Sequence, residues 1–167
     1  MPAIIIYIMG VSGSGKTTIG KKLSERTAIP FFDADDLHSP ASKEKMKAGQ
    51  PLTDTDRAGW LTIVNGLAKE QMKKGGAIIA CSALKEKYRT VLSNGITVPV
   101  FWFFLNGSYK LIQKRIQERK DHFMPPALLA SQFQTLEIPG QAITIDVSKT
   151  PAEIVETIIS VITKTES

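Results

Sequence analysis

Hydrophobic and polar positions follow two alternating patterns along the chain, which predict strands and helices in turn. Nearly continuous apolar runs predict strands covered on both faces of a sheet, and these runs are 3–9, 29–33, 77–81, 98–105 and 143–147. Between them, apolar residues recur three and four positions apart, which predicts helices over 15–26, 53–74 and 109–119, and a last helix from 151. Strands separated by helices favour a parallel sheet with helices on both faces.

Two polar stretches, about 36–60 and about 119–137, interrupt this alternation. In an α/β sheet, such excursions after the carboxyl ends of strands usually carry the functional site.

Capping residues mark the starts of two predicted helices. Thr150 precedes Pro151 as an N-cap residue, and Thr53 and Asp54 are both candidates for the cap of the long helix. We therefore expect one domain over 1–167 with both excursions outside its core.

The composition excludes several classes of protein. The 167 residues fit one domain, and 43% hydrophobic with 22% charged residues exclude a disordered or low-complexity chain. A single cysteine excludes an internal disulfide and fits a reducing cytosol. The longest apolar runs fall far short of the roughly 20 residues that cross a bilayer, and no basic segment precedes the first run. We expect a cytoplasmic protein without membrane contact.

The net charge of +5 is concentrated in one part of the chain. Eight basic and only three acidic residues lie between Cys81 and His122. A local basic excess attracts polyanions, from nucleic acid to ATP, and it is also typical of solvated helix faces. Because no aromatic-rich RNA-binding pattern accompanies it, we expect no nucleic-acid partner.

A phosphate-binding motif lies between the first predicted strand and the first predicted helix. Residues 10–17 match the pattern G-x-x-x-x-G-K-[ST]. Backbone N–H groups of such a loop point at phosphate oxygens, Lys16 supplies charge to the β- and γ-phosphates, and Thr17 offers a hydroxyl to Mg²⁺. The motif predicts binding of a nucleoside triphosphate without distinguishing a kinase from an ATPase or a switch. The residues expected to bind ATP here are Gly10, Val11, Ser12, Gly13, Ser14, Gly15, Lys16, Thr17 and Thr18.

Acidic residues follow the second predicted strand. Asp33 and Asp35 are two positions apart and point the same way if the strand geometry continues. With Asp36 they put three carboxylates in four residues, which repel one another unless a cation is near. In phosphoryl transfer, one carboxylate can hold Mg²⁺ while another orients a hydroxyl and accepts its proton; the alternative is a solvated turn that caps a helix. We expect His38, which follows, at the surface.

An arginine in an unusual place marks the long helix. Arg57 lies in its predicted first turn, where the helix dipole disfavours a cation. An anionic partner is therefore expected, either Asp56 or a substrate carboxylate, and the spacing does not choose between them. After the third strand, Cys81 and Ser82 stand where many P-loop proteins carry a metal-binding acid, so Asp33 would have to help hold the metal.

A second pair of arginines precedes an irregular stretch. Arg115 and Arg119 are four apart and share one helix face. This arrangement suits a lid that closes over phosphates, with a basic helix end favoured by the dipole as the alternative.

These motifs resemble those of the gluconate kinases, small P-loop sugar-acid kinases related to shikimate kinase and the nucleoside monophosphate kinases. The resemblance runs almost from end to end of the chain. Beside the phosphate loop, its most specific parts are Cys81-Ser82-Ala83-Leu84-Lys85, His122-Phe123-Met124 and Ser131-Gln132-Phe133; it also includes Asp33-Ala34-Asp35, Gly49-Gln50-Pro51-Leu52-Thr53-Asp54, Asp56-Arg57 and Tyr88-Arg89.

The resemblance implies a three-layer P-loop fold of the nucleoside monophosphate kinase type, with a five-stranded parallel sheet, a substrate-binding excursion at about 36–60 and a lid at about 119–137. It implies transfer of the γ-phosphate of ATP to the 6-hydroxyl of D-gluconate, with Mg²⁺ required. It also allows a homodimer, because dimers are common in that family. The alternatives are another small-molecule kinase, for shikimate or a nucleoside monophosphate, and a nucleotide-binding regulator.

The resemblance also implies roles for individual residues. Lys16 and Asp35 are the catalytic residues, and Thr17 and Asp33 hold the metal. Arg57 grips the substrate carboxylate, Arg115 and Arg119 are lid arginines that bind ATP, and the further substrate contacts are Lys85, Arg89 and His122. One departure is Asp121, which stands where a glycine is common before the histidine.

Overall fold

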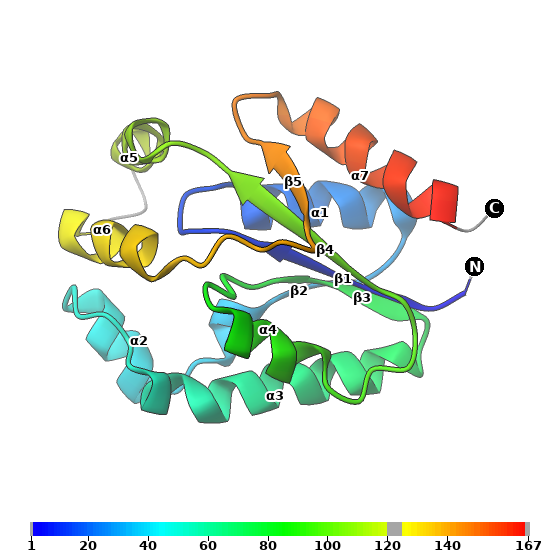
Figure 1. Cartoon of the computed structure of the whole chain (residues 1–167), viewed down its shortest axis with the longest axis horizontal. Coiled ribbons are helices and arrows are strands. Elements are labelled where there is room, and N and C mark those ends of the chain that lie inside the picture. The colour runs from blue at the N-terminus through cyan, green and yellow to red at the C-terminus, as the bar shows by residue number, and fades with distance from the viewer. Residues whose placement is uncertain (1, 120–124, 166–167) are drawn as a thin grey trace.

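A computed structural model describes residues 2–119 and 125–165, and its strands form one parallel sheet in the order β2-β3-β1-β4-β5 (Figure 1). The strands are β1 (Ile4–Met9), β2 (Phe31–Asp33), β3 (Gly76–Ala80), β4 (Val100–Asn106) and β5 (Ile143–Asp146). The helices are α1 (Lys16–Thr27), the 3-10 helix η1 (Ala34–Leu37), α2 (Pro40–Lys47), α3 (Asp54–Met72), α4 (Glu86–Ser93), α5 (Tyr109–Glu118), α6 (Pro126–Thr135) and α7 (Pro151–Thr165).

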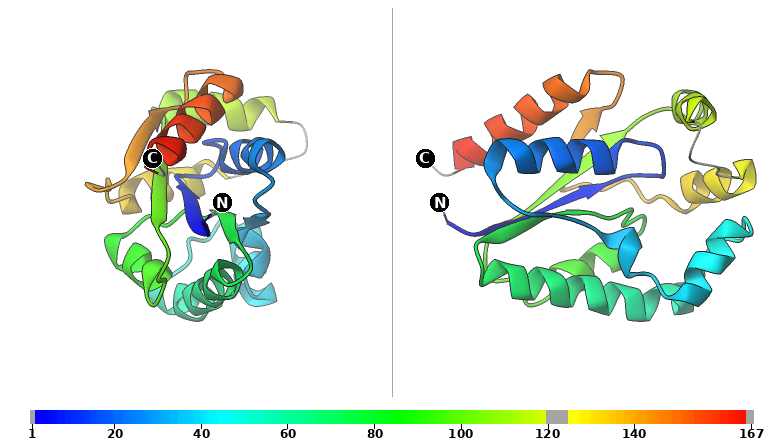
Figure 2. Two further views of the ribbon diagram at one scale, coloured as in Figure 1. Left: turned by 90° about the vertical axis from the view of Figure 1, so that its right-hand side faces the viewer. Right: turned by 180° about the vertical axis from the view of Figure 1, so that it is seen from behind.

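The central strand β1 supplies side chains to both faces of the sheet. Successive residues of a strand point to opposite faces, and all six residues of β1 are buried. Ile4, Ile6 and Ile8 pack with residues of α1 and α7, whereas Ile5, Tyr7 and Met9 pack with residues of α3 and α4. Helices thus cover both faces of the sheet, as Figure 1 and the views in Figure 2 show, and the predicted three-layer α/β fold is confirmed.

The topology places the phosphate loop at the middle of the sheet edge. β1 pairs with β3 on one side and with β4 on the other, and the chain leaves the carboxyl end of β1 directly into residues 10–15. Ligands of open α/β sheets bind at such a point, beyond the carboxyl ends of the strands. The helices α2, α5 and α6 gather around this end of the molecule (Figures 1 and 2).

All five predicted strands are present, and no bound differs from the predicted one by more than two residues. The two polar excursions, by contrast, are more regular than expected. The first contains η1 and α2, and the second contains α6. Local signals for α2 exist in the sequence, because Ser39 accepts a hydrogen bond from the N–H of Ser42 and Pro40 occupies the first turn. Thr53 caps α3 and forms a reciprocal capping box with Asp56, so Asp54 lies inside the helix.

Within 2–119 and 125–165, the structure has no helix that is both long enough and apolar enough to cross a membrane.

Candidate active site

The phosphate loop is shaped by close packing and by its own lysine. Gly13 has a φ of +81°, and a Cβ there would lie 2.7 Å from Cγ1 of Ile116 on α5, so only glycine fits. The Nζ of Lys16 donates hydrogen bonds to the carbonyl oxygens of Gly10 (2.8 Å) and Val11 (3.0 Å). The ammonium group therefore lies across the mouth of the loop, where the β- and γ-phosphates of a nucleotide would lie. Burial lowers its pKa, and the nearby carboxylates of Asp35 and Asp33 oppose that shift.

A hydroxyl and a carboxylate meet beside the loop. Oγ1 of Thr17, in the first turn of α1, donates to Oδ2 of Asp33 at 3.0 Å. Oδ1 of Asp33 accepts the N–H of Asp35 at 3.0 Å, so Asp33 also caps η1. Mg²⁺ prefers oxygen ligands and usually binds through one or two protein groups together with substrate phosphates and water. This donor set fits Mg²⁺, and no group of three or more His, Cys, Asp or Glu side chains in the described residues forms a metal cage.

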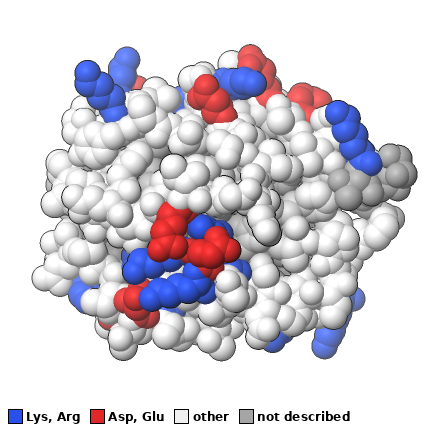
Figure 3. Space-filling model, viewed as in Figure 1, with Lys and Arg blue, Asp and Glu red and all other residues white. Residues whose placement is uncertain are grey.

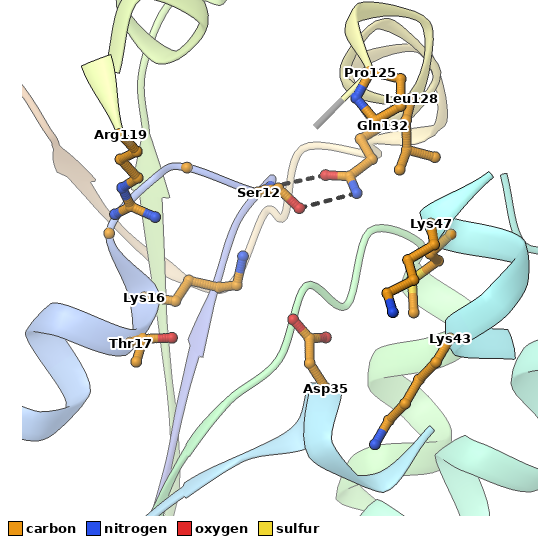
Figure 4. Close-up of a pocket in the computed structure, with 13 residues that line it drawn as sticks. Ser12, Lys16, Thr17, Asp35, Lys43, Lys47, Arg119, Pro125, Leu128 and Gln132 are labelled. Atoms are coloured by element: carbon orange, nitrogen blue, oxygen red, sulfur yellow. Dashed lines mark hydrogen bonds between the residues drawn. The ribbon is translucent and has the colours of Figure 1, made fainter. Parts of the chain in front are cut away.

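Two adjoining cavities meet at Asp35. The larger, about 600 Å³, opens over the phosphate loop between α2, α6 and the end of α5, and Figure 4 shows Arg119 on one side of it with Lys43 and Lys47 on the other. The smaller, about 50 Å³, extends from the loop toward Arg57 on α3. The side chains that line both cavities are Ser12, Lys16, Asp35, Met46, Leu128 and Gln132. A nucleotide phosphate over Lys16 and an acceptor molecule near Arg57 would therefore meet at Asp35.

Arg57 is oriented by α3 and α4. Its Nη1 donates to the carbonyl of Leu52 (2.8 Å) and to the hydroxyl of Tyr88 (3.2 Å). Asp56, the alternative partner expected from the sequence, instead accepts from Nζ of Lys45 at 2.7 Å and from the N–H of Thr53 at 2.8 Å. Both of these hydrogen bonds use Nη1, so Nε and Nη2 can face an acceptor molecule.

The loop after β3 and the start of α4 form an ionic cluster with α3. The carboxylate of Asp54 accepts hydrogen bonds from Lys85, Lys87 and the hydroxyl of Tyr88, and these bonds hold its pKa well below the usual range. The guanidinium of Arg89 is 6% exposed and binds Glu86 and the carbonyl of Ala83. Figure 3 shows acidic and basic side chains gathered in the middle of this face. Three of the eight basic residues of the stretch, Lys85, Lys87 and Arg89, are therefore already paired with acids.

The predicted substrate and lid residues thus occupy different surroundings. Asp35 and Arg57 line one cavity, whereas Lys85 and Arg89 direct their charges into the ionic cluster. Arg119 lines the larger cavity, and Nη2 of Arg115 donates to the carbonyl of Val147 at 2.6 Å. His122 and the neighbouring departure Asp121 lie outside the described residues. The roles of all these side chains stay predictions.

The sequence argument missed the places of two side chains, one packed beside the cleft and one that lines it. His38, expected at the surface, is 8% exposed and stacks on Trp60 with ring centroids 4.2 Å apart. Burial, with the positive charges of Arg57 and Lys43, lowers the pKa of His38 to about 4. Gln132 binds the phosphate loop at Ser12 (Figure 4). The only sequence signal for Gln132 was its place in the Ser-Gln-Phe motif, which indicates no role by itself.

The fold and the site together define a P-loop kinase of small molecules. The sequence profile of the shikimate kinase family matches residues 12–163. The chain is 44% identical over 158 residues to the gluconokinase of Gluconobacter oxydans (strain 621H), covering 92% of this chain and 88% of that protein.

Solved structures agree. A gluconokinase from Sinorhizobium meliloti 1021 superposes with a TM-score of 0.82 at 38% identity, over 93% of this chain and 88% of that one. An unliganded sugar kinase from Janibacter sp. HTCC2649 superposes with a TM-score of 0.86 at 38% identity, over 95% of this chain and 94% of that one. The chain belongs to the gluconokinase family, within the wider group of shikimate kinase-like enzymes, and is an ATP-dependent kinase that uses Mg²⁺.

Proposed function

We propose that this protein transfers the γ-phosphate of ATP to the 6-hydroxyl of D-gluconate and releases ADP and 6-phospho-D-gluconate. The observation that carries this proposal is the small cavity in which Asp35 and Arg57 lie, opening at Lys16 of the phosphate loop. Gluconate has a carboxylate at one end and hydroxyls along its length, so it can place its carboxylate at Arg57 and its last hydroxyl at the phosphate loop. The identity of 35–46% to several gluconokinases over most of the chain supports the same acceptor.

Several charged groups at the cleft have a part in the proposed transfer. Lys16 and Arg119 neutralise the charge of the phosphates. Mg²⁺, which Thr17 and Asp33 would hold, adds to this neutralisation and supplies a Lewis acid when bound. The oxygen at C6 forms a bond to the γ-phosphorus while the bond from that phosphorus to the ADP oxygen breaks. Asp35 orients the hydroxyl and accepts its proton. Because the transition state is loose, positioning and charge neutralisation matter more than the strength of this base.

Arg57 supplies specificity for an acidic acceptor. A guanidinium binds a carboxylate with two parallel hydrogen bonds, and Tyr88 and Leu52 already hold one edge of this side chain. Glucose lacks the carboxylate and would leave the half-buried guanidinium of Arg57 without an anionic partner in the cavity, which lowers the affinity for glucose. Glucose should therefore be a poor acceptor.

The test is ATP turnover by the purified protein with gluconate, glucose, shikimate and AMP supplied separately. Gluconate should give the highest kcat/KM, and Arg57→Ala should reduce gluconate use far more than residual glucose use. Arg26→Ala, on an exposed arginine paired with Glu156 away from the cleft, is the control for loss of an arginine. Faster turnover of shikimate or AMP, or equal use of glucose and gluconate, would contradict the proposal.

We also propose a cytoplasmic location, as the single buried cysteine Cys81 favours, and a homodimer, as the family resemblance allows. Sedimentation equilibrium of the purified protein tests the second statement directly.

A further inference from the structure

One contact joins α6 to the phosphate loop across 120 residues of sequence. Oε1 of Gln132 accepts the backbone N–H of Ser12 at 2.8 Å, and Nε2 of Gln132 donates to Oγ of Ser12 at 3.1 Å. The oxygen and the nitrogen of the Gln132 amide therefore both form hydrogen bonds with the same residue, Ser12. Figure 4 shows this side chain reaching from α6 across the cleft to the loop.

The contact lies at the boundary between the two cavities. Gln132 and Ser12 line both of them, together with Lys16 and Asp35. The transferred phosphate has to pass this boundary on its way from the nucleotide to the acceptor. A side chain that fixes Ser12 here fixes the part of the loop closest to the transfer.

The helix that carries Gln132 is itself anchored. Just beyond its end, the N–H of Glu137 donates to the carbonyl of Leu84 at 2.7 Å, and the Glu137 carbonyl accepts from Nη2 of Arg89 at 3.0 Å. On its other side, Phe133 packs edge-on against Tyr109 of α5, with ring centroids 5.4 Å apart. The amide of Gln132 thus reaches the loop from a helix that is held at both α5 and the loop after β3.

We propose that Gln132 is a positioning residue for phosphoryl transfer: its side-chain amide holds Ser12, and so aligns the phosphate loop with the acceptor cavity. Phosphoryl transfer depends on alignment of the attacking and leaving oxygens, and a displacement of about 1 Å can cost about 10²-fold in rate. This role rests on the proposed kinase function but not on the identity of the acceptor. The Arg89–Glu137 contact supports the same role, because it holds the chain just beyond the end of α6.

The test compares Gln132→Met, which keeps the length of the side chain and removes both hydrogen bonds, with Gln134→Met. Gln134 lies on the exposed side of the same helix and is the matched control. Gln132→Met should lower kcat by about 10–100-fold with KM for ATP changed by less than about threefold, while Gln134→Met stays near wild type. A purely structural role would instead lower the thermal midpoint and leave kcat per folded molecule unchanged.

A double-mutant cycle with Ser12→Ala shows whether the two residues act through each other. Ser12→Ala removes only the bond to Oγ, so it should lower kcat less than Gln132→Met, and adding it to Gln132→Met should lower kcat no further than about twofold. Multiplying effects, an unchanged kcat in Gln132→Met, or tighter ATP binding by that variant would overturn the inference. If Gln132→Met is too unstable to assay, Gln132→Asn replaces it. The asparagine amide is one methylene too short to reach Ser12, so this variant should show the same loss of kcat. An inactive wild-type protein contradicts the proposed function instead.

Discussion

Two aspartates only two positions apart have different surroundings. Asp33 binds the hydroxyl of Thr17 and the N–H of Asp35, which suits a carboxylate that helps to hold Mg²⁺. Asp35 lines both cavities, with Nε2 of His38 3.8 Å from its Oδ1. The difference arises because the chain turns into η1 directly after Asp33, so the side chains do not continue the alternation of a strand.

Asp35→Asn tests the proposed role of this carboxylate as the proton acceptor. The amide keeps the shape of the side chain but loses its charge and most of its ability to accept a proton, so kcat/KM for gluconate should fall by about 10²–10⁴-fold. Asp36→Asn is the matched control, because Asp36 is exposed and lines neither of the two adjoining cavities. Steady-state assays at saturating ATP measure both variants, and an unchanged kcat/KM in Asp35→Asn would assign the proton acceptor elsewhere.

At the scale of elements, α3 and α4 act together to hold Arg57. The hydroxyl of Tyr88 on α4 accepts from Nη1 of Arg57 and donates to Asp54, both on α3. Lys85 and Lys87 form salt bridges with the same Asp54 carboxylate. The orientation of Arg57 is therefore set by two packed helices and not by one side chain.

Tyr88→Phe should weaken the positioning of Arg57 without removing its guanidinium from the cavity. Loss of a hydrogen bond to a charged group costs about 1.5–3 kcal/mol, so KM for gluconate should rise by about 10–100-fold while KM for ATP stays nearly constant. Tyr109→Phe is the matched control, because the Tyr109 ring packs on Phe133 away from Arg57. Equal changes in the two KM values would show that Tyr88 has only a structural role.

The lid predicted over about 119–137 contains α6, which already contacts the phosphate loop through Gln132. ATP and gluconate together should protect 115–137 from thermolysin more than either ligand alone, because each would bring negative charge to a cavity lined by an arginine, Arg119 or Arg57. Cleavage in the connection 94–99, at the amino end of β4, should not change and is the internal reference. Equal cleavage of 115–137 with and without ligands would argue against closure.

At the scale of the whole molecule, His38 links stability to pH. It is buried against Trp60 and stays neutral to about pH 4, whereas an unfolded histidine takes up a proton near pH 6.5. Between these values the unfolded state binds more protons, so the free energy of unfolding falls as the pH is lowered through this window. The shift corresponds to about 2–3 kcal/mol between pH 7 and pH 4.

Urea unfolding from pH 7 to pH 4 measures this dependence. His38→Phe keeps a ring against Trp60 and removes the titrating group, so its stability should fall less steeply with acid than that of the wild type. Other acid-sensitive groups, among them Asp56 with a pKa lowered to about 2 by its bonds to Lys45 and Thr53, act below this window and affect both proteins alike. Parallel curves for the two proteins would contradict the prediction.

The sheet, most of its connecting helices and the phosphate loop could be predicted from the amino-acid sequence alone. These features depend on local patterns: continuous apolar runs for buried strands, residues such as Thr53 and Thr150 at helix starts, and glycines and Lys16 at fixed spacing. The resemblance to gluconate kinases added the acceptor and roles for Asp35 and Arg57, which the structure brings to one cavity.

Which polar side chains face the cleft, and which stabilise the fold, became visible only in three dimensions. Arg89, an expected substrate contact, binds Ala83, Glu86 and Glu137, and His38 is covered by Trp60. Gln132 meets Ser12 only because α6 folds over the end of β1. A sequence specifies the donors and acceptors of a side chain, but partners far apart along the chain are chosen by packing, which brings the ends of parallel strands and their loops together in space.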